Sequence, residues 1–423
     1  MADLSTPRDI AIFIDGTWNR RGTLGITNVR KLYEATASGR HAGREQVKLY
    51  IPGVGTKPQA QGEGLIDEEY RAHLALHLER EFPRGWSATR RWTGGVTGKG
   101  TTARIKAAYR AVCDEFDRNR GDRVFLFGFS RGAFATRSLA GFMEKVGLLI
   151  REKLNAVDEA YRLYETSEDA SQSALAEFLY KLTGRRLPTV EDDAWLPLHF
   201  LGVWDTVAAL GLPSRLGWLS APYTEYHQVD VPPNVMHARH GLALHELRES
   251  FEPLLWTGCG HASLEQVWFP GAHADVGGGY LPGETGLSDA ALLWMAAEAE
   301  AKGLVLDRAG KWLRPTPRPP EVHHEIRGVF LATLPAVRRW LDDANDAGSV
   351  ENCHFHASAR DRLFASARPN YTHKHPVVNA VLRRADELTV PRRRLARLRR
   401  NRIVQSRQQT PPDAGSSPRA TLG

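Results

Sequence analysis

Cysteine is scarce in this chain of 423 residues, which contains only Cys113, Cys259 and Cys353. An odd and sparse set argues against a disulfide framework, and the absence of any Cys-x-x-C pair argues against a structural zinc site. Apolar runs are short as well. None approaches the length of about 18 residues that indicates a transmembrane helix, and the N-terminal sequence has no secretory apolar region. We therefore expect cytoplasmic synthesis without a signal peptide, with export by a specialised secretion system left open.

Acidic residues are absent from the arginine-rich segment Arg392–Arg407, which contains eight arginines. The formal net charge of the whole chain is only +7, so the rest of the chain is close to neutral. The high isoelectric point therefore does not indicate a nucleic-acid-binding protein. Aliphatic residues are interleaved among the arginines, and two interpretations stay open. The segment is either a basic helix that lies on an anionic membrane surface, or a solvated helix or disordered tail.

Two patterns that resemble ligand sites lack necessary residues. His73 and His77 lie four residues apart on a helical pattern, but no third ligand is signalled nearby, so they predict a solvated helix face. The glycine-rich run 94–101 lacks the first glycine of a phosphate-binding loop and the hydroxyl residue after its lysine. We therefore expect no metal ion and no cofactor, and phosphoryl transfer is a weak hypothesis.

Apolar runs of strand length alternate with helical patterns along the first three quarters of the chain. The strand-like runs are Ile10–Ile14, Val47–Ile51, Val124–Phe127, Leu198–Trp204 and Leu264–Phe269. Helical periodicity covers 29–33, 102–118, 134–146 and 233–251, and Ser288 is placed to cap a helix that ends near Lys302. This alternation predicts an α/β fold with a mostly parallel central sheet flanked by helices.

The strand-to-helix turn Gly128–Gly132 has the sequence Gly-Phe-Ser-Arg-Gly. It matches Gly-x-Ser-x-Gly, the nucleophile elbow of α/β-hydrolases, in which glycines permit a sharp turn that exposes the serine at its tip. Placement between an apolar run and a helical pattern is the context that this motif requires. Ser130 is therefore the candidate nucleophile, and the alternative is an ordinary turn with a capping serine.

Three apolar runs end in residues that could form a catalytic triad: Ser130, Asp205 and His273. Their order in the chain is that of α/β-hydrolases. Histidine takes the proton of the serine hydroxyl, and aspartate fixes the tautomer of the histidine. Asp205 has a helix-capping role as its alternative. The rival histidines are His240, His245 and His261, which lie on a predicted helix or in an irregular loop.

An oxyanion hole requires backbone N–H groups close to the nucleophile. The residue after the serine, Arg131, supplies the first candidate. Gly16 or Thr17 supplies the second, because their loop also follows a strand. Asp15 at the end of that strand and Asp275 beside the histidine are candidate supporting residues.

We expect an α/β-hydrolase catalytic domain over residues 8–305, an extension over 306–380 that packs on or near the core, and a basic helix with a disordered tail over 381–423. Segments of about 57–92, 151–195 and 211–235 predict helical or loop insertions that form a cap. The stretch Gly211–Tyr226 fits either a lid or acyl-binding wall, or a loop buried against the core.

Four stretches together resemble the marker motifs of a known family: 13–19, 128–134, 202–207 and 269–280. It is an α/β-hydrolase domain family that includes bacterial type VI secretion phospholipase effectors. The resemblance covers about residues 10–305, with the motifs in the family's order, and it does not extend to the last hundred residues. It implies a triad of Ser130, Asp205 and His273 and esterase activity on lipids. One departure is His245, which stands where the family stretch usually has Asp.

The leading hypothesis is a serine hydrolase that cleaves carboxylic esters of lipids or phospholipids through an acyl-enzyme. One alternative is a small-ester carboxylesterase. The other is a hydrolase-fold binding or accessory module without catalysis.

Overall fold

The computed structural model of the chain describes residues 6–16, 25–53, 99–166, 198–207, 230–248, 251–256, 263–281, 283–316, 323, 353–356 and 358. Several predicted features lie outside these residues. They include the insertion at 57–92, the stretch Gly211–Tyr226, the histidines His73 and His77, and the arginine-rich segment.

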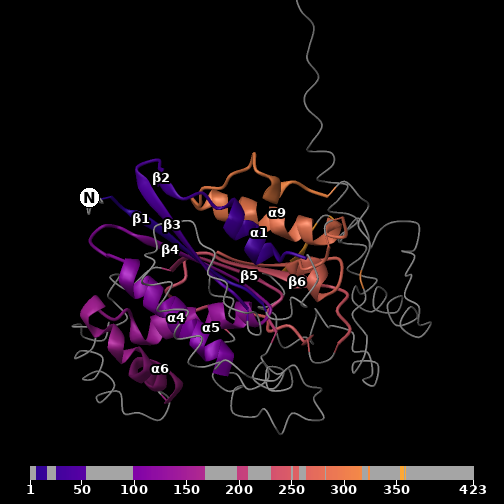
Figure 1. The fold of residues 1–423 in the computed structure, drawn as a ribbon. Coiled ribbons are helices and arrows are strands. Elements are labelled where there is room, and N and C mark those ends of the chain that lie inside the picture. Colours follow the sequence, from indigo (N-terminus) through magenta and orange to yellow (C-terminus); the bar gives the residue numbers. More distant parts are fainter. Residues whose placement is uncertain are drawn as a thin grey trace, which may run out of the picture.

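An eight-stranded sheet forms the centre of the fold, with the strand order β2-β3-β1-β4-β5-β6-β7-β8 (Figure 1). The strands are β1 (Arg8–Ile14), β2 (Gly39–His41), β3 (Arg44–Ile51), β4 (Arg123–Phe129), β5 (Leu198–Trp204), β6 (Ala238–Ala243), β7 (Leu264–Phe269) and β8 (Cys353–Phe355). Every neighbouring pair is parallel except β2 and β3. The predicted mostly parallel sheet is therefore confirmed, and the carboxyl ends of the parallel strands share one edge.

The central strands are buried on both faces. In β1, Ile10, Ile12 and Ile14 belong to one apolar cluster, whereas Ala11 and Phe13 belong to the cluster on the opposite face. Strands covered on both faces are apolar throughout rather than alternately apolar and polar. This explains why the strand-like runs are continuous in the sequence.

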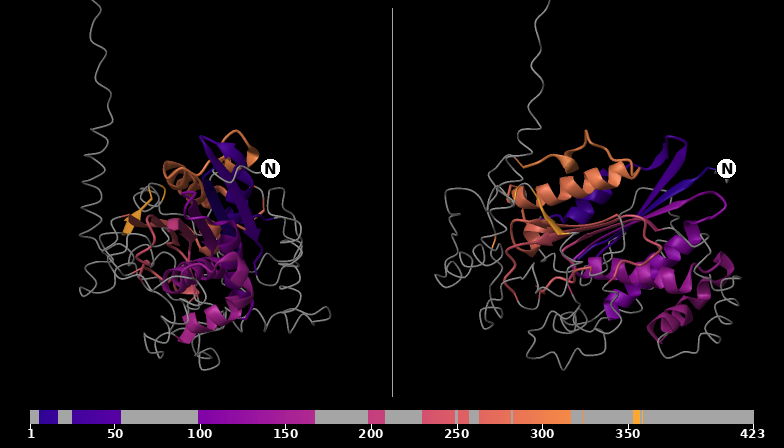
Figure 2. Two further views of the ribbon diagram at one scale, coloured as in Figure 1. Left: turned by 90° about the vertical axis from the view of Figure 1, so that its left-hand side faces the viewer. Right: turned by 180° about the vertical axis from the view of Figure 1, so that it is seen from behind.

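Helices cover the two faces in separate layers (Figures 1 and 2). One layer contains α4 (Lys99–Glu115), α5 (Arg131–Val146), the 3₁₀ helix η1 (Arg151–Ala156) and α6 (Val157–Thr166). The other contains α1 (Asn28–Ala35), α9 (Gly286–Ala301) and the 3₁₀ helix η5 (Lys311–Leu313), and the short helix α8 (His273–Gly277) follows β7. None of these described helices combines the length and apolarity needed to cross a bilayer.

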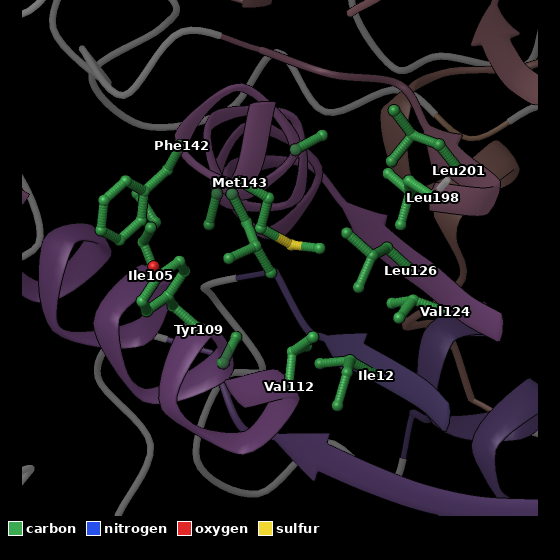
Figure 3. Packing of buried hydrophobic residues seen from close by; sticks show 14 of the residues in the cluster. Ile12, Ile105, Tyr109, Val112, Val124, Leu126, Phe142, Met143, Leu198 and Leu201 are labelled. Carbon is green, nitrogen blue, oxygen red and sulfur yellow. The ribbon is translucent and has the colours of Figure 1, made fainter. Parts of the chain in front are cut away.

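Aromatic packing fixes α5 against α4 (Figure 3). The ring centroids of Tyr109 and Phe142 are 4.1 Å apart in a stacked arrangement. The Tyr109 hydroxyl donates a hydrogen bond of 2.7 Å to the carbonyl of Gly147, the C-cap residue of α5, which has φ of 78°. The helix that begins at the Gly128–Gly132 turn is therefore held firmly at its far end.

The helix predicted over 233–251 is wrong, because its centre forms the strand β6. All six residues of β6 are buried, so the strand shows no period of two. Its most polar member, Arg239, forms an ion pair of 2.7 Å with Glu298 on α9. The sequence does not show that Arg239 has this partner. A charged residue in the middle of a buried strand was therefore not expected, and the strand was not predicted.

The predicted cap of α9 is also wrong. The N-cap is Thr285 rather than Ser288, whose Oγ donates back to the carbonyl of Thr285 at 3.0 Å. The buried side chain of Leu287 belongs to the additional first turn. The end of the helix near Lys302, the C-cap residue, is as predicted.

Described parts of the C-terminal extension join the core. Leu306 and Leu313 belong to the apolar cluster on the face of α1 and α9, and β8 pairs with β7. Likewise, Val157 and Tyr161 of the predicted insertion at 151–195 are buried in the cluster on the opposite face. We propose that the described residues of this extension, within 306–316 and 353–358, belong to the core of the 8–305 domain.

Candidate active site

The predicted triad residues meet at the carboxyl edge of the sheet, after β4, β5 and β7. The Nε2 atom of His273 lies 2.8 Å from Ser130 Oγ. The Nδ1 atom of the same ring lies 2.6 Å from Asp205 Oδ2. All three side chains are buried. The arrangement can pass a proton from the serine hydroxyl to the imidazole while the carboxylate orients the ring.

The turn at Ser130, which we call the elbow (Gly128–Gly132), is determined by backbone crowding. Ser130 has φ of 58°, an unfavourable conformation for a residue with a side chain. A Cβ at Gly128 would lie 2.6 Å from the carbonyl oxygen of Gly132, and a Cβ at Gly132 would lie 2.2 Å from that of Ile14. The side chain of Ser130 makes no capping bond to α5. The capping-serine alternative is therefore excluded for this conformation.

Asp205 is held by both carboxylate oxygens and by its backbone. Its Oδ1 accepts the N–H of Ala243 at 2.9 Å, while Oδ2 faces His273. Its own N–H donates to the carbonyl of Gly241 at 2.7 Å. The residue has φ of 39°, which places it with Ser130 among the few strained non-glycine positions of the described chain. Strain of this kind persists only where surrounding contacts enforce it.

His273 is the first residue of the short helix α8. Its ring lies between two aromatic residues, with centroid distances of 4.6 Å to Phe129 and 5.0 Å to Phe251. Burial lowers the pKa of His273, although the hydrogen bond and charge of Asp205 act in the opposite direction. The ring is therefore neutral, and able to accept a proton, at neutral pH.

Two of the rival histidines support backbone rather than face the serine. His240 lies in β6, where its Nε2 accepts the N–H of Thr206 at 3.2 Å. His245 follows β6, and its Nδ1 accepts the N–H of Gly271 at 2.8 Å. The third rival, His261, lies outside the described residues.

The predicted oxyanion donors differ in their geometry. Arg131 begins α5, so its N–H belongs to the first turn, where the helix dipole favours negative charge. Burial lowers the pKa of its guanidinium to about 10, which leaves it charged at neutral pH. A Cβ at Gly16 would lie 3.1 Å from Ser130 Cβ, but the Gly16 N–H already donates to Asp15 Oδ1 at 2.7 Å. Thr17 lies outside the described residues.

Asp15 stabilises the loop behind the elbow. Besides the Gly16 N–H, its carboxylate accepts hydrogen bonds from Thr27 Oγ1 at 2.8 Å and Tyr50 Oη at 2.5 Å. Burial raises the pKa of Asp15. Its backbone carbonyl would lie 2.6 Å from a Cβ at Gly132. The backbone of Asp15 therefore packs closely against Gly132 and helps to fix the position of the nucleophile Ser130.

Asp275 forms a second pair with a histidine, separate from the triad. Its Oδ1 lies 2.6 Å from the Nδ1 of His323, and its Oδ2 accepts the backbone N–H of His323 and that of Ala272, each at 2.9 Å. The His323 ring stacks on Tyr280 with a centroid distance of 3.9 Å. Asp275 thus connects Ala272, the N-cap residue of α8, to a residue of the C-terminal extension.

The sequence reasoning missed Glu246, Arg248 and Phe251, which lie beside His273. The only signal was that Glu246 ends a stretch resembling the family, because spacing alone does not show which loop it faces. Within the described residues, no group of three or more His, Cys, Asp or Glu side chains is placed to hold a metal ion.

The fold and the arrangement of Ser130, His273 and Asp205 are those of an α/β-hydrolase-like protein. A family profile described as "T6SS, Phospholipase effector Tle1-like, catalytic domain" matches residues 8–298. This match covers well over half of the chain, so the chain belongs to that family.

Individual relatives are more distant. The uncharacterized protein YEL023C of Saccharomyces cerevisiae is 30% identical over 254 residues, which is 60% of this chain and 33% of that protein. The chain thus spans about a third of the length of this relative.

Two solved structures are similar in sequence at a low level. An uncharacterized protein from Pseudomonas aeruginosa is 21% identical, with a TM-score of 0.38, over 74% of this chain and 48% of that one. The Tle1 effector bound to the VgrG spike of the type VI secretion system is 20% identical, with a TM-score of 0.34, over 67% and 53%.

Proposed function

We propose that the chain is a serine hydrolase that cleaves carboxylic ester bonds of lipids, with phospholipids as its substrate class. The observation that carries the proposal is the hydrogen-bonded path from Asp205 through His273 to Ser130, with distances of 2.6 and 2.8 Å. Membership of the Tle1-like phospholipase effector family supports a phospholipid substrate. The same membership supports export by a type VI secretion system.

In the proposed reaction, Ser130 Oγ attacks the ester carbonyl carbon as His273 Nε2 takes its proton. Asp205 stabilises the resulting imidazolium. The bond from the carbonyl carbon to the alcohol oxygen then breaks, His273 gives its proton to that oxygen, and the acyl group stays on Ser130. Water next attacks the acyl-enzyme and gives a proton to His273. The fatty acid leaves as Ser130 Oγ recovers this proton.

Each tetrahedral intermediate carries a negative oxygen that needs hydrogen-bond donors. The N–H of Arg131 is the first donor in the proposal, and Gly16 or Thr17 supplies the second. Since the Gly16 N–H is bonded to Asp15, it serves the oxyanion only by leaving that acceptor. A donor of this kind lowers the barrier by about 3–4 kcal/mol.

The proposal also includes two surfaces for the substrate. The lipid ester itself is bound near Ser130, and the arginine-rich segment Arg392–Arg407 contacts the anionic membrane that contains it. This segment lies outside the described residues, and its role is inferred from its charge alone.

Ser130→Ala tests the proposal. We expect at least about a 10⁴-fold loss of kcat on short p-nitrophenyl esters and on phospholipid vesicles, because the attacking oxygen is gone. Labelling by a fluorophosphonate probe should also disappear. The matched control is Ser138→Ala, which removes a half-buried serine from the same helix, and it should keep activity and labelling.

The alternatives give different results in the same assays. Absence of labelling in wild type as well as in Ser130→Ala would contradict the hydrolase proposal and support a binding module. Ser130-dependent cleavage of short esters without cleavage of vesicles would support a small-ester carboxylesterase instead.

A further inference from the structure

The backbone turn that presents His273, residues Gly271–His273, is held by the dipeptide His245–Glu246 after β6. Neither residue has a role in the proposed mechanism. Both are nevertheless buried and bonded to this turn.

His245 binds Gly271 through two reciprocal hydrogen bonds. The backbone N–H of His245 donates to the carbonyl of Gly271 at 2.8 Å, and the N–H of Gly271 donates to His245 Nδ1, also at 2.8 Å. A nitrogen that accepts a backbone N–H carries no proton, so the imidazole is neutral with its proton on Nε2. The ring thus supplies a hydrogen-bond acceptor at a fixed point.

The backbone of Gly271 has little room to move when the side chain of His245 is changed. It has φ of 111°, in the region that favours glycine, and a Cβ there would lie 2.3 Å from Asp275 Cβ. The turn is therefore tightly packed on one side and hydrogen-bonded to His245 on the other. Losing the acceptor would leave a buried N–H without a partner, which is unfavourable.

Glu246 holds the next point of the turn. Its Oε2 accepts the backbone N–H of His273 at 3.2 Å. Arg248 fixes this carboxylate from the other side, with its Nε 2.8 Å from Oε1 and a terminal nitrogen 2.8 Å from Oε2. The guanidinium in turn lies 3.5 Å from the ring centroid of Phe251, which contacts the His273 ring edge-on.

We propose that His245 and Glu246 form a two-point clamp on the Gly271–His273 turn, and that His245 is a positioning residue for the base His273. The inference rests on the proposed serine hydrolase function. The hydrogen bonds of the clamp end on the backbone of the turn, so they set the distance from Nε2 to Ser130 Oγ without taking part in proton transfer. A displacement of a reacting group by about 1 Å can cost about 10²-fold in rate.

The experiment compares His245→Leu with His245→Asn. Leucine removes the acceptor, whereas the Oδ1 atom of asparagine occupies nearly the place of Nδ1 and can accept the same N–H. We expect His245→Leu to lower kcat on p-nitrophenyl esters, and the rate of fluorophosphonate labelling of Ser130, by up to about 10²-fold with little change in KM. His245→Asn should recover most of that loss.

A matched control is His199→Leu. It removes another histidine that bonds a backbone carbonyl, that of Lys302 at 2.8 Å, but at the amino end of β5. This variant should keep the wild-type kcat. A purely structural role for His245 predicts instead that the two leucine variants lose stability alike, without a selective fall in kcat or a rescue by asparagine.

Amide hydrogen exchange of the peptide that covers Gly271–His273 provides a readout independent of activity. Exchange should accelerate in His245→Leu and return toward the wild-type rate in His245→Asn. Unchanged exchange, or wild-type kcat in His245→Leu, would overturn the clamp. Failure of the proposed function would instead appear as absence of labelling in wild type as well as in Ser130→Ala.

Discussion

The two halves of the candidate site are held in place by different kinds of contact. On one half, the nucleophile Ser130 is fixed by backbone against backbone, because Gly128 and Gly132 leave no room for a Cβ. On the other half, the base His273 is fixed by polar side chains and by aromatic neighbours. The position of the nucleophile is therefore determined sterically. The position of the base depends on several hydrogen bonds that can be removed one at a time.

This difference has a consequence for tolerance to mutation. Changes in the elbow should act on folding, since the crowded atoms belong to the main chain of β1 and α5. Changes around His273 should act on the rate of reaction, since the main chain there can persist while the ring shifts.

The largest effect is expected from Asp205→Asn. The asparagine can still accept the Ala243 N–H, but it lacks the charge that stabilises the imidazolium of His273 and fixes its tautomer. A fall in kcat of about 10⁴-fold is expected, with a stability close to that of wild type. Ester hydrolysis and thermal unfolding measure the two properties.

Asp158→Asn is the control for this variant, because Asp158 is an exposed carboxylate paired with Lys106 on the helical surface. It should leave kcat unchanged. An Asp205→Asn enzyme that keeps more than about a tenth of the wild-type kcat would show that the carboxylate is not needed by the base.

The contrast also explains what could be predicted from the sequence. The elbow was predictable because a steric requirement leaves a local trace: glycines at two fixed offsets from a serine between a strand and a helix. The candidate acid and base were predictable in part, because parallel strands bring their carboxyl ends to one edge. Ser130, Asp205 and His273 each follow such a strand.

The support of the base was not predictable, for a physical reason. His245 and Glu246 lie about 27 residues from the turn that they hold, and nothing in their own neighbourhood indicates which backbone groups they bond. The same reasoning applies to β6. Its buried Arg239 is paired with Glu298, which is 59 residues away, so the sequence around Arg239 did not indicate a buried strand. Polar contacts of this kind are set by the tertiary structure.

The second expected effect is on the other half of the site. In Gly132→Ala, the new Cβ would lie 2.2 Å from the carbonyl oxygen of Ile14 and 2.6 Å from that of Asp15. Since both neighbours are backbone atoms, they cannot rotate away, and we expect a loss of about 3 kcal/mol or more in the free energy of unfolding. Urea denaturation measures this loss.

Gly241→Ala is the comparison for that variant. Its nearest neighbour would be the side-chain atom Trp204 Cδ1 at 3.2 Å, which can shift slightly, so we expect a loss of less than about 1 kcal/mol. If the two alanine variants were equally stable, crowding by the main chain would not be what fixes the elbow.

The smallest expected effect is a pH dependence of stability and of reaction rate that arises from the base His273. Burial lowers the pKa of His273 below the value of about 6.5 that it has in the unfolded chain. As pH falls through 6.5, the unfolded chain therefore takes up a proton before the folded protein does, and stability from this group is lost below that pH. The ring also stays neutral, and able to act as a base, at pH values slightly below 6.5.

The rate of fluorophosphonate labelling of Ser130, measured as a function of pH, tests whether the pKa of His273 is lowered in the folded protein. The rate should fall on the acid side with a midpoint below about 6.5, since the neutral ring is required. Asp205 and Glu246 oppose the downward shift, and Arg248 adds to it. Removing the Glu246 charge in Glu246→Gln should therefore move the midpoint further down. A midpoint above 6.5 would mean that the charge of Asp205, rather than burial, dominates the base half of the site.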